Sequence, residues 1–323
     1  MNFQDLAKIE NPDFYLDVAF RRASKKISEL RQQKKDTKKT KLEQQKSLEQ
    51  TRMDIISTRL MDSLMGILKK FPSISQLPPF YQELINCTLD FPVLKKSLGA
   101  LNWAQKKVHD ITKIYRSKIQ KADHLDRVFK LQKEYYGRIS SVLKQIKNEL
   151  HYLDEARKVM RKYPAVKTSD KIRSVSILGF PNVGKTTLLY KLTGSKPEIN
   201  SYPFTTKGIN ISYIKGEKHK IQILDTPGTL NRFNKMNDIE KQAYLTIKYV
   251  ADYIVYVFDL TEEYYSLKDQ IKLYTTLKEH DKPITVYISK ADILDKKVID
   301  EFKKKYKTAI TDYKDLKKTL SGY

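Results

Sequence analysis

The stretch GFPNVGKTT, residues 179–187, has the residue types and spacing of a phosphate-binding loop, G-x-x-x-x-G-K-[S/T]. Glycines let backbone N–H groups close around phosphates, and the N-terminus of a following helix favours their negative charge. Lys185 would place a positive charge on the phosphates, and the Thr186 hydroxyl would bind Mg²⁺. Because the β-branched run RSVSILG leads into the motif, we expect a strand-loop-helix turn that binds a nucleoside triphosphate. The expected contacts are Phe180, Pro181, Asn182, Val183, Gly184, Lys185, Thr186 and Thr187.

A second motif, D-x-x-G, begins at Asp225, the last residue of the run KIQILD. Asp225 would hold the metal through a water molecule, and the Gly228 N–H would sense the γ-phosphate. Between the two motifs lies SYPFTTKG, residues 201–208. There Thr206, or Thr205 as second choice, would complete the Mg²⁺ shell only when the γ-phosphate is present. The alternative is a β-promoting threonine pair in a loop.

A third motif, Ser-Lys-Ala-Asp, follows the run PITVYIS and stands in the place of the guanine-reading motif N/T-K-x-D. Asp292 would accept hydrogen bonds from guanine N1–H and from the N2 amine, two donors that adenine does not present. The alkyl part of Lys290 would lie along the base. ATP would leave this carboxylate unpaired, and such a mismatch rejects a substrate by orders of magnitude. Ser289 departs from the usual Asn or Thr, so a weaker brace between this loop and the phosphate loop is expected.

The last base-contacting loop should follow a short strand near YKTAI, residues 306–310. The next stretch, TDYKD, matches the usual Ser-Ala pattern poorly, so no residue is assigned there. Thr229 follows Gly228, where many hydrolases of this type carry a glutamine that orients the attacking water. Its short side chain is poorly suited to that task. We therefore expect slow hydrolysis, with Lys185, Thr206 and Gly228 acting on the phosphates.

Composition favours a polyanionic partner. Lys and Arg number 62 against 38 Asp and Glu, giving a net charge of +24, and the N-terminal half carries the larger share. Nucleic acid is the first partner class that such a charge suggests, and an anionic membrane surface is the second. A lysine-rich surface that is merely solvated is the alternative.

The sequence also limits the compartment. Cys87 is the only cysteine, so no internal disulfide can form, and we expect a small buried apolar residue in a reducing compartment. No stretch approaches the ~18 apolar residues of a membrane-spanning helix, and the start MNFQDLAKIENPDFY lacks the pattern of a signal peptide. A cytoplasmic protein with no membrane partner is the expectation.

The 323 residues suffice for two domains, and the local patterns change near residue 168. In residues 1–168, apolar residues recur at steps of three and four, as in Ile56, Leu60 and Leu64, which predicts amphipathic helices. Breaks at 71–80, 90–92 and 121–124 suggest four major helices packed as an antiparallel all-α bundle. Residues 31–50 lack the apolar stripe and form either an exposed helix or a disordered arm.

In residues 169–323, short β-branched runs alternate with glycine, proline and helical stretches. This alternation predicts an α/β domain with a mostly parallel sheet and helices on both faces. The expected fold class is thus a basic N-terminal all-α helical bundle (1–168) followed by an α/β P-loop GTPase domain (169–323) with a mostly parallel sheet.

The motifs GFPNVGKTT, YPFTT, DTPG and SKAD, in this order, resemble those of the Obg-like branch of translation-factor GTPases. The whole chain is more similar still to the nucleolar GTP-binding protein (NOG) subfamily. FPSISQLPPFYQELIN (71–86) and ALNWAQKKV (100–108) resemble its N-terminal helical region, and IEKQAYLTIKYVADYIVYVFDLTE (239–262) resembles the segment after its second switch.

This resemblance implies a GTPase that converts GTP to GDP and phosphate, acts in assembly of the large ribosomal subunit, and binds ribosomal RNA through its helical domain. Two departures stand out: the chain ends soon after the GTPase domain, and Ser289 replaces the usual residue. A short archaeal-type member, acting as a monomer, is the simplest interpretation, and "nucleolar" then describes the family.

In some relatives, the residue at the position of Asn182 helps to hold K⁺ beside the β- and γ-phosphates, where a cation can neutralise developing charge. The resemblance therefore adds Asn182 to the hydrolytic residues, with K⁺, ribosomal RNA or a protein partner as the activator. The alternative is that Asn182 only braces the loop.

Two functions of different class remain. In the first, GTP orders SYPFTT and DTPGTLN, the ordered switches fix the protein on the nascent large subunit, and hydrolysis releases it. In the second, the protein is an RNA-binding structural factor that the nucleotide stabilises, with incidental hydrolysis. A GTPase on a membrane surface is disfavoured because no lipidation signal or exposed aromatic-rich helix accompanies the basic residues.

Overall fold

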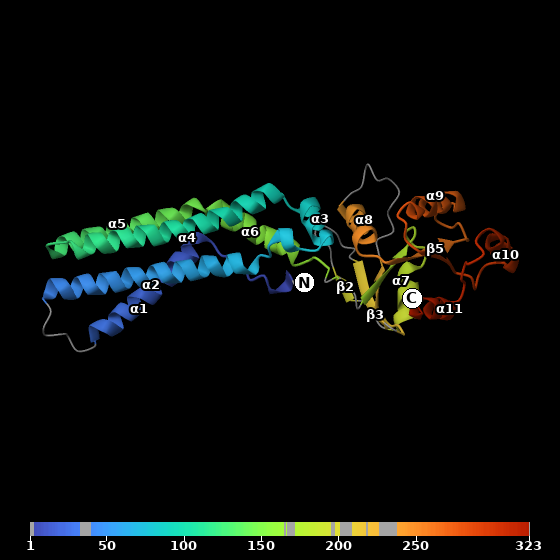
Figure 1. The fold of residues 1–323 in the computed structure, drawn as a ribbon, viewed down its shortest axis with the longest axis horizontal. Coiled ribbons are helices and arrows are strands. Elements are labelled where there is room, and N and C mark those ends of the chain that lie inside the picture. The colour runs from blue at the N-terminus through green and yellow to red at the C-terminus, as the bar shows by residue number, and fades with distance from the viewer. Residues whose placement is uncertain are drawn as a thin grey trace. The chain divides into compact units, whose positions relative to one another are not determined.

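The structure, a computed structural model, describes residues 3–32, 40–164, 166, 172–194, 198–200, 209–217, 219–225 and 238–322. Its contacts divide the chain into two compact units, and Figure 1 labels the helices and some of the strands. We call Asp5–Ser73 together with Leu89–Lys158 the helical unit. The remainder, Ile74–Thr88 and Val159–Tyr323 with the segment that ends at Gln4, is the sheet unit. The chain therefore passes from one unit to the other more than once.

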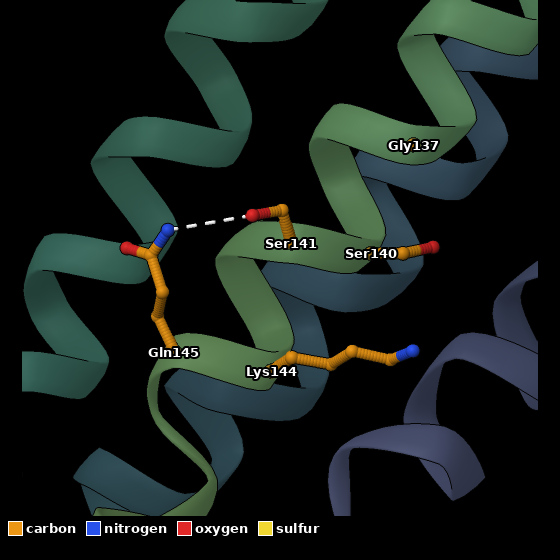
Figure 2. Close-up of a pocket in the computed structure, with 5 residues that line it drawn as sticks. All are labelled: Gly137, Ser140, Ser141, Lys144 and Gln145. Atoms are coloured by element: carbon orange, nitrogen blue, oxygen red, sulfur yellow. Dashed lines mark hydrogen bonds between the residues drawn. The ribbon is translucent and has the colours of Figure 1, made fainter.

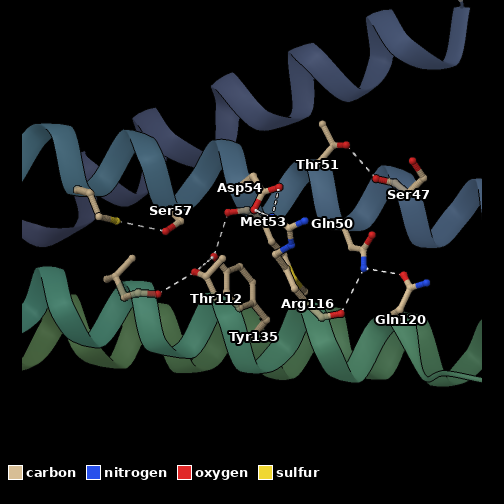
Figure 3. A network of polar contacts seen from close by, with 12 residues as sticks. Ser47, Gln50, Thr51, Met53, Asp54, Ser57, Thr112, Arg116, Gln120 and Tyr135 are labelled. Carbon is tan, nitrogen blue, oxygen red and sulfur yellow. Dashed lines mark hydrogen bonds and ion pairs between the residues drawn. The ribbon is translucent and has the colours of Figure 1, made fainter.

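At the centre of the helical unit, α2 (Lys41–Lys70) packs along α4 (Phe91–Gln120). Gln50 of α2 donates to Gln120 at 3.0 Å, whereas Gln105 of α4 donates to Met61 O at 3.0 Å. Residue numbers rise along one helix as they fall along the other, so the two helices are antiparallel. Figure 3 shows the polar contacts between them, including an Nη1 atom of Arg116 that lies 2.8 Å from both carboxylate oxygens of Asp54.

Three further helices complete this unit: α1 (Pro12–Gln32), α5 (Leu125–Gln145) and most of α6 (Lys147–Met160). The predicted apolar stripes are confirmed as core, since Ile56, Leu60 and Leu64 are 0% exposed. In the part of the chain that the structure describes, no helix is long and apolar enough to cross a membrane.

All three predicted breaks are confirmed. Residues 71–78 separate α2 from α3 (Pro79–Thr88), residues 89 and 90 precede α4, and residues 121–124 precede α5. The predicted number of helices is too low, because the described residues between 12 and 160 form six. One unpredicted break is at Ile146, whose φ of −96° and ψ of 19° end α5 one residue before α6. The apolar stripe continues through this residue, which is 2% exposed, so the pattern gives no sign of the break.

The segment 31–50, expected to form either an exposed helix or a disordered arm, is helical in part. A capping box begins α2, in which Glu43 N donates to Thr40 Oγ1 at 3.2 Å and Thr40 N donates to Glu43 Oε2 at 2.8 Å. Residues 41–50 are therefore helical, although residues 33–39 lie outside the described residues.

The sheet unit contains the predicted α/β fold. Its strands lie in the order β2-β3-β4-β1-β5-β6, in which β4, β1, β5 and β6 are parallel neighbours and β3 is antiparallel to β2 and β4. The strands are β1 (Ile172–Leu178), β2 (Glu198–Asn200), β3 (Ile209–Lys215), β4 (Lys220–Asp225), β5 (Tyr253–Asp259) and β6 (Ile284–Ser289). The helices beside them are α7 (Lys185–Thr193), α8 (Asp238–Tyr249), α9 (Leu267–Lys278), α10 (Lys296–Lys305) and α11 (Tyr313–Ser321).

The sheet topology fixes where a ligand can bind. Strand β1 pairs with β4 on one side and with β5 on the other, and the carboxyl ends of these parallel strands meet at one edge of the sheet. Ligands of open α/β sheets bind outside this edge, where the strand order reverses. The segments after β1, β4, β5 and β6 all begin there.

Helix α3 belongs to the sheet unit, although its sequence lies between α2 and α4. It packs against α8, and its Phe80 and Tyr81 are each 1% exposed. The Tyr81 hydroxyl lies 2.8 Å from Pro164 O and accepts a hydrogen bond from Val166 N at 3.0 Å. Cys87, expected to be buried, is half-buried in this helix. The boundary near residue 168 stays a prediction, and the contact-based units divide the chain differently.

Candidate nucleotide-binding site

Residues 179–184 connect β1 to α7, as the strand-loop-helix pattern predicts. Gly179 has φ of 148°, and a Cβ there would lie 2.7 Å from Val257 O of β5. Gly184 precedes the first residue of α7 with φ of 91°. Both glycines allow backbone angles that other residues rarely adopt, and Gly179 lets the loop approach the neighbouring strand. The loop therefore passes close to β5 and leads directly into the N-terminus of α7.

Lys185 begins α7 and points back into the loop. Its side chain is buried, with the residue 7% exposed, and Nζ donates a hydrogen bond to Phe180 O at 2.6 Å. An ammonium in the loop at a helix N-terminus suits an anionic ligand. The predicted contacts with phosphate oxygens are consistent with this placement.

The second motif reaches the same place from β4. Thr186 Oγ1 donates to Asp225 Oδ2 at 2.6 Å, and Asp225, the last residue of β4, is 4% exposed. A hydroxyl and a carboxylate are the hard oxygen donors that Mg²⁺ prefers, and this ion usually keeps water among its ligands. The donor chemistry of the two residues thus fits Mg²⁺, which Thr186 and Asp225 would hold and which would supply positive charge to the phosphates.

The guanine motif follows β6 and lies against the phosphate loop. Ser289 Oγ donates to Phe258 O at 3.0 Å, which ties the end of β6 to β5. A Cβ built on Gly184 would lie 3.6 Å from the Ser289 Cβ, an ordinary van der Waals distance. Ser289 therefore lies beside Gly184 of the phosphate loop, while its hydroxyl bonds to β5. Asp292 is exposed at the same edge.

Lys290 has an ion-pair partner that the motifs did not identify. Its Nζ lies 2.8 Å from Asp259 Oδ2 and 3.1 Å from Glu263 Oε2. Burial by itself would raise the pKa of Asp259, but hydrogen bonds from Lys290 and Thr261 outweigh burial and hold that pKa below its usual value. The hydrogen bond to Asp259 in turn raises the pKa of Lys290. An ionised pair with Asp259 therefore fixes the position of Lys290 within the guanine motif.

The segment between β5 and α9 also touches the phosphate loop. The Tyr265 ring lies 4.4 Å from the Phe180 ring, centroid to centroid, at an interplanar angle of 35°. The sequence analysis identified neither Asp259 nor Tyr265 as a site residue, because neither belongs to a motif. Asp259 ends the run DYIVYVFD at the carboxyl edge of a strand, which is where site residues gather in this fold class, but Tyr265 carries no such mark.

A short β pairing occurs near YKTAI, as predicted. Ile310 forms a parallel bridge with Tyr287, and Ile288 N donates to Ile310 O at 2.9 Å. Asp312, two residues later, accepts a hydrogen bond from Lys314 N at 2.8 Å and so caps α11. The stretch after the bridge lies next to β6, and no base contact is assigned to it.

Thr205, Thr206, Gly228 and Thr229 lie outside the described residues. Of the predicted site residues, the structure brings Thr186 at the start of α7 to Asp225 at the end of β4, and Gly184 of the phosphate loop close to Ser289 at the end of β6.

Two family models cover most of the chain. The NOG1 N-terminal helical domain matches residues 3–167, and the 50S ribosome-binding GTPase matches residues 174–290.

Similar proteins agree with both models. An uncharacterized protein of Methanocaldococcus jannaschii is 40% identical over 296 residues, which are 91% of this chain and 81% of that protein. Nucleolar GTP-binding protein 1 of Drosophila melanogaster is 31% identical over 259 residues, which are 79% of this chain but 39% of that protein. The solved structure of Era from Aquifex aeolicus bound to GDP.AlF4- is 29% identical and covers 46% of this chain and 56% of that chain, with a TM-score of 0.36.

A phosphate loop after β1 and a guanine motif at the end of β6 lie in one mostly parallel sheet, and the GTPase model matches residues 174–290. Together they define the class: the protein is a P-loop GTPase. The N-terminal half of the chain identifies the family. Since the helical-domain model matches residues 3–167, the chain belongs to the nucleolar GTP-binding protein 1 family.

Proposed function

We propose that this GTPase is a nucleotide-controlled switch in assembly of the large ribosomal subunit and that it binds ribosomal RNA through the helical unit. The observation that carries the proposal is the pairing, in one chain, of the helical domain of this family with a 50S ribosome-binding GTPase domain. The net charge of +24 supports an RNA partner.

In the nucleotide site, backbone N–H groups of residues 182–184 and the Lys185 ammonium bind the phosphates. Thr186 and Asp225 hold Mg²⁺, which neutralises charge on the phosphates when it is bound. Asp292 reads guanine, while the pair with Asp259 orients Lys290 for contact with the base. Each of these roles is part of the proposal.

Hydrolysis by the isolated protein is slow in this proposal, and K⁺ accelerates it. Asn182 is exposed at the tip of the phosphate loop with φ of 62°, where its side-chain oxygen can reach a cation beside the phosphates. Turnover should rise when K⁺ replaces Na⁺, and Asn182→Ala should remove that rise. Turnover that is indifferent to K⁺, to Asn182→Ala and to large subunits would contradict the idea of an external activator.

The switch itself requires different affinities in the two nucleotide states. We expect GTP to act on residues 201–208 and 224–231 and so to hold the protein on the large subunit until hydrolysis. A ligand shifts such an equilibrium only through its differential affinity for the two states.

The decisive experiment is co-sedimentation with large ribosomal subunits and their precursors, with either GDP or a non-hydrolysable GTP analogue, at fixed K⁺, Mg²⁺ and ionic strength. Salt must be constant because a protein of net charge +24 binds RNA non-specifically at low ionic strength. Preferential binding with the analogue supports the switch. Equal binding in both states favours the RNA-binding structural factor, and absence of binding removes the ribosomal partner.

A further inference from the structure

The single tryptophan of the chain is exposed. Trp103 lies in α4 and retains 43% of its accessible surface, and Ile114 in the same helix retains 52%. Their neighbours Leu101, Ala104 and Val108 are 0% exposed, so α4 already has a well-buried core face. The tryptophan is therefore placed on the opposite, solvent-facing side, where a large aromatic ring needs an explanation other than core packing.

Trp103 and Ile114 belong to a regular row of residues. Steps of seven and four residues return to nearly the same side of an α-helix. Lys96, Trp103, Lys107, Ile114 and Lys118 follow these steps, and every one of them is exposed. We call these five residues the Trp103 stripe. Each of its two apolar residues is thus followed, one helical turn later, by a lysine.

The charges of the stripe are available to a partner. Across the described part of the chain, no ion pair joins Lys96, Lys107 or Lys118 to a carboxylate. Lys118 Nζ lies 4.8 Å from the Tyr115 ring centroid. Asp110 is the acidic residue on this face, and Lys106 beside it adds another positive charge.

The spacing disfavours a protein groove as partner. A helix that binds in such a groove presents apolar residues at successive i, i+3, i+4 and i+7 positions. Here Lys106, Lys107 and Asp110 occupy those positions after Trp103. An exposed aromatic ring between lysines is instead a feature of single-stranded nucleic acid sites, in which bases stack on aromatic side chains and lysines neutralise phosphates.

A second surface feature of the helical unit is a shallow hollow on α5, lined by Gly137, Ser140, Ser141, Lys144 and Gln145 (Figure 2). Gln145 Nε2 donates to Ser141 Oγ at 3.4 Å, so part of its polar lining is used within the helix. The hollow has no aromatic ring and is lined by one lysine. It lacks the stacking surface that distinguishes the Trp103 stripe.

We propose that the Trp103 stripe binds a single-stranded segment of RNA, with an unpaired base stacked on Trp103 and phosphates contacted by Lys96, Lys107 and Lys118. This inference rests on the proposed RNA-binding function and locates a contact within it.

The chain carries its own probe, because Trp103 is the only tryptophan and stacking of a base quenches indole fluorescence. The full-length protein is titrated with a single-stranded oligoadenylate and with an RNA duplex of equal length, at one fixed salt concentration. The single strand should quench the emission, and the duplex should quench it much less. Absence of quenching by the single strand, or equal quenching by both, would overturn the proposal.

Variants test the two kinds of contact separately, with labelled oligoadenylate as ligand and thermal unfolding as the check on folding. Trp103→Ala should weaken binding roughly tenfold, and Trp103→Phe should weaken it less, because a ring remains. Combined Lys96→Gln, Lys107→Gln and Lys118→Gln should lower the slope of log affinity against log salt by about 2. The matched control changes Lys303, Lys304 and Lys305 of α10 to Gln and should leave that slope nearly unchanged.

Unchanged affinity of Trp103→Ala, or an equal loss of slope in the α10 control, would contradict the stripe. These results are distinct from failure of the ribosomal function. If wild-type protein sediments with large subunits while Trp103→Ala binds oligoadenylate normally, only the stripe is wrong. If the single strand quenches Trp103 but no subunit binds, only the ribosomal partner is wrong.

Discussion

At the scale of single residues, the site depends on contacts between side chains that are distant in sequence. Thr186 and Asp225 are joined by a 2.6 Å hydrogen bond, and Lys290 and Asp259 by a 2.8 Å ion pair. The first pair was expected from motif order. The second was not, because Asp259 belongs to no motif and meets Lys290 only through the pairing of β5 with β6.

Thr186→Ala should lower GTP turnover by roughly a hundredfold, because it removes a Mg²⁺ ligand and the hydroxyl that bonds to Asp225. Thr186→Ser keeps the hydroxyl and should retain most of the activity. Turnover is measured across a range of Mg²⁺ concentrations. Removal of Mg²⁺ with a chelator should lower the turnover of the wild type towards that of Thr186→Ala. Equal turnover of wild type and Thr186→Ala in the presence of Mg²⁺ would show that the Thr186 hydroxyl is not a ligand.

Asp259→Asn should reduce the free energy of unfolding by about 1.5–3 kcal/mol at pH 7, because a buried charge-assisted hydrogen bond is lost. The folded-state pKa of Asp259 is depressed. The stabilising effect of its ionised form is therefore complete above the unfolded-state pKa of about 4 and is lost as pH falls through the lower folded-state pKa.

Urea unfolding of wild type and Asp259→Asn at a series of pH values measures this difference. It should be constant near neutral pH and shrink in acid. Asp269→Asn, at the exposed start of α9, is a control that should show a smaller effect. A difference between wild type and Asp259→Asn that grows in acid would have the wrong sign.

At the scale of helices and strands, local patterns predicted much of what the structure shows. Asp90 caps α4 by accepting from Val93 N at 3.1 Å, and the neighbouring proline fits the first turn, so this break could be predicted from residue types. The Ile146 break could not be predicted, since a buried isoleucine continues the apolar stripe there. The packing of α3 on α8 is a tertiary contact, and no periodicity in either helix specifies it.

Tyr81→Phe should destabilise the protein by about 1–3 kcal/mol, because buried backbone groups of Pro164 and Val166 would lose a hydrogen-bond partner. Burial raises the pKa of Tyr81 to about 12, so this hydroxyl stays protonated through the working pH range. Tyr152→Phe is the matched control, since the Tyr152 hydroxyl donates to Asp90 O at 2.8 Å in an exposed setting. Denaturant unfolding measures the free energy of unfolding of both variants. Equal losses in Tyr81→Phe and Tyr152→Phe would show that burial of the Tyr81 hydrogen bonds adds nothing to stability.

At the scale of the whole molecule, the fold class followed from the sequence because its two halves differ in period, composition and motifs. The sequence did not show which segments of the chain pack into the same unit. Periodicity marks residues 79–88 as a helix but cannot say which unit it joins.

A fragment comprising residues 169–323 should therefore be less stable than the sheet unit within the full chain. It lacks α3, whose Phe80, Tyr81, Leu84 and Ile85 are buried, and so it exposes apolar surface of α8 to water. Thermal unfolding with an apolar dye gives the comparison. A peptide of residues 74–88 added to the fragment should raise its unfolding midpoint, and a fragment as stable as the intact protein would show that α3 contributes little.

The place of α3 in the chain also affects how the protein is made. Because a ribosome synthesises the N-terminus first, α3 emerges long before α8, whose first residue is Asp238. During that interval the helices on either side of α3 can already associate, since α2 and α4 pack against each other. The nascent chain must therefore carry an apolar helix without its final neighbour until the last third is translated, and a chaperone that shields Phe80 to Ile85 would act in this period.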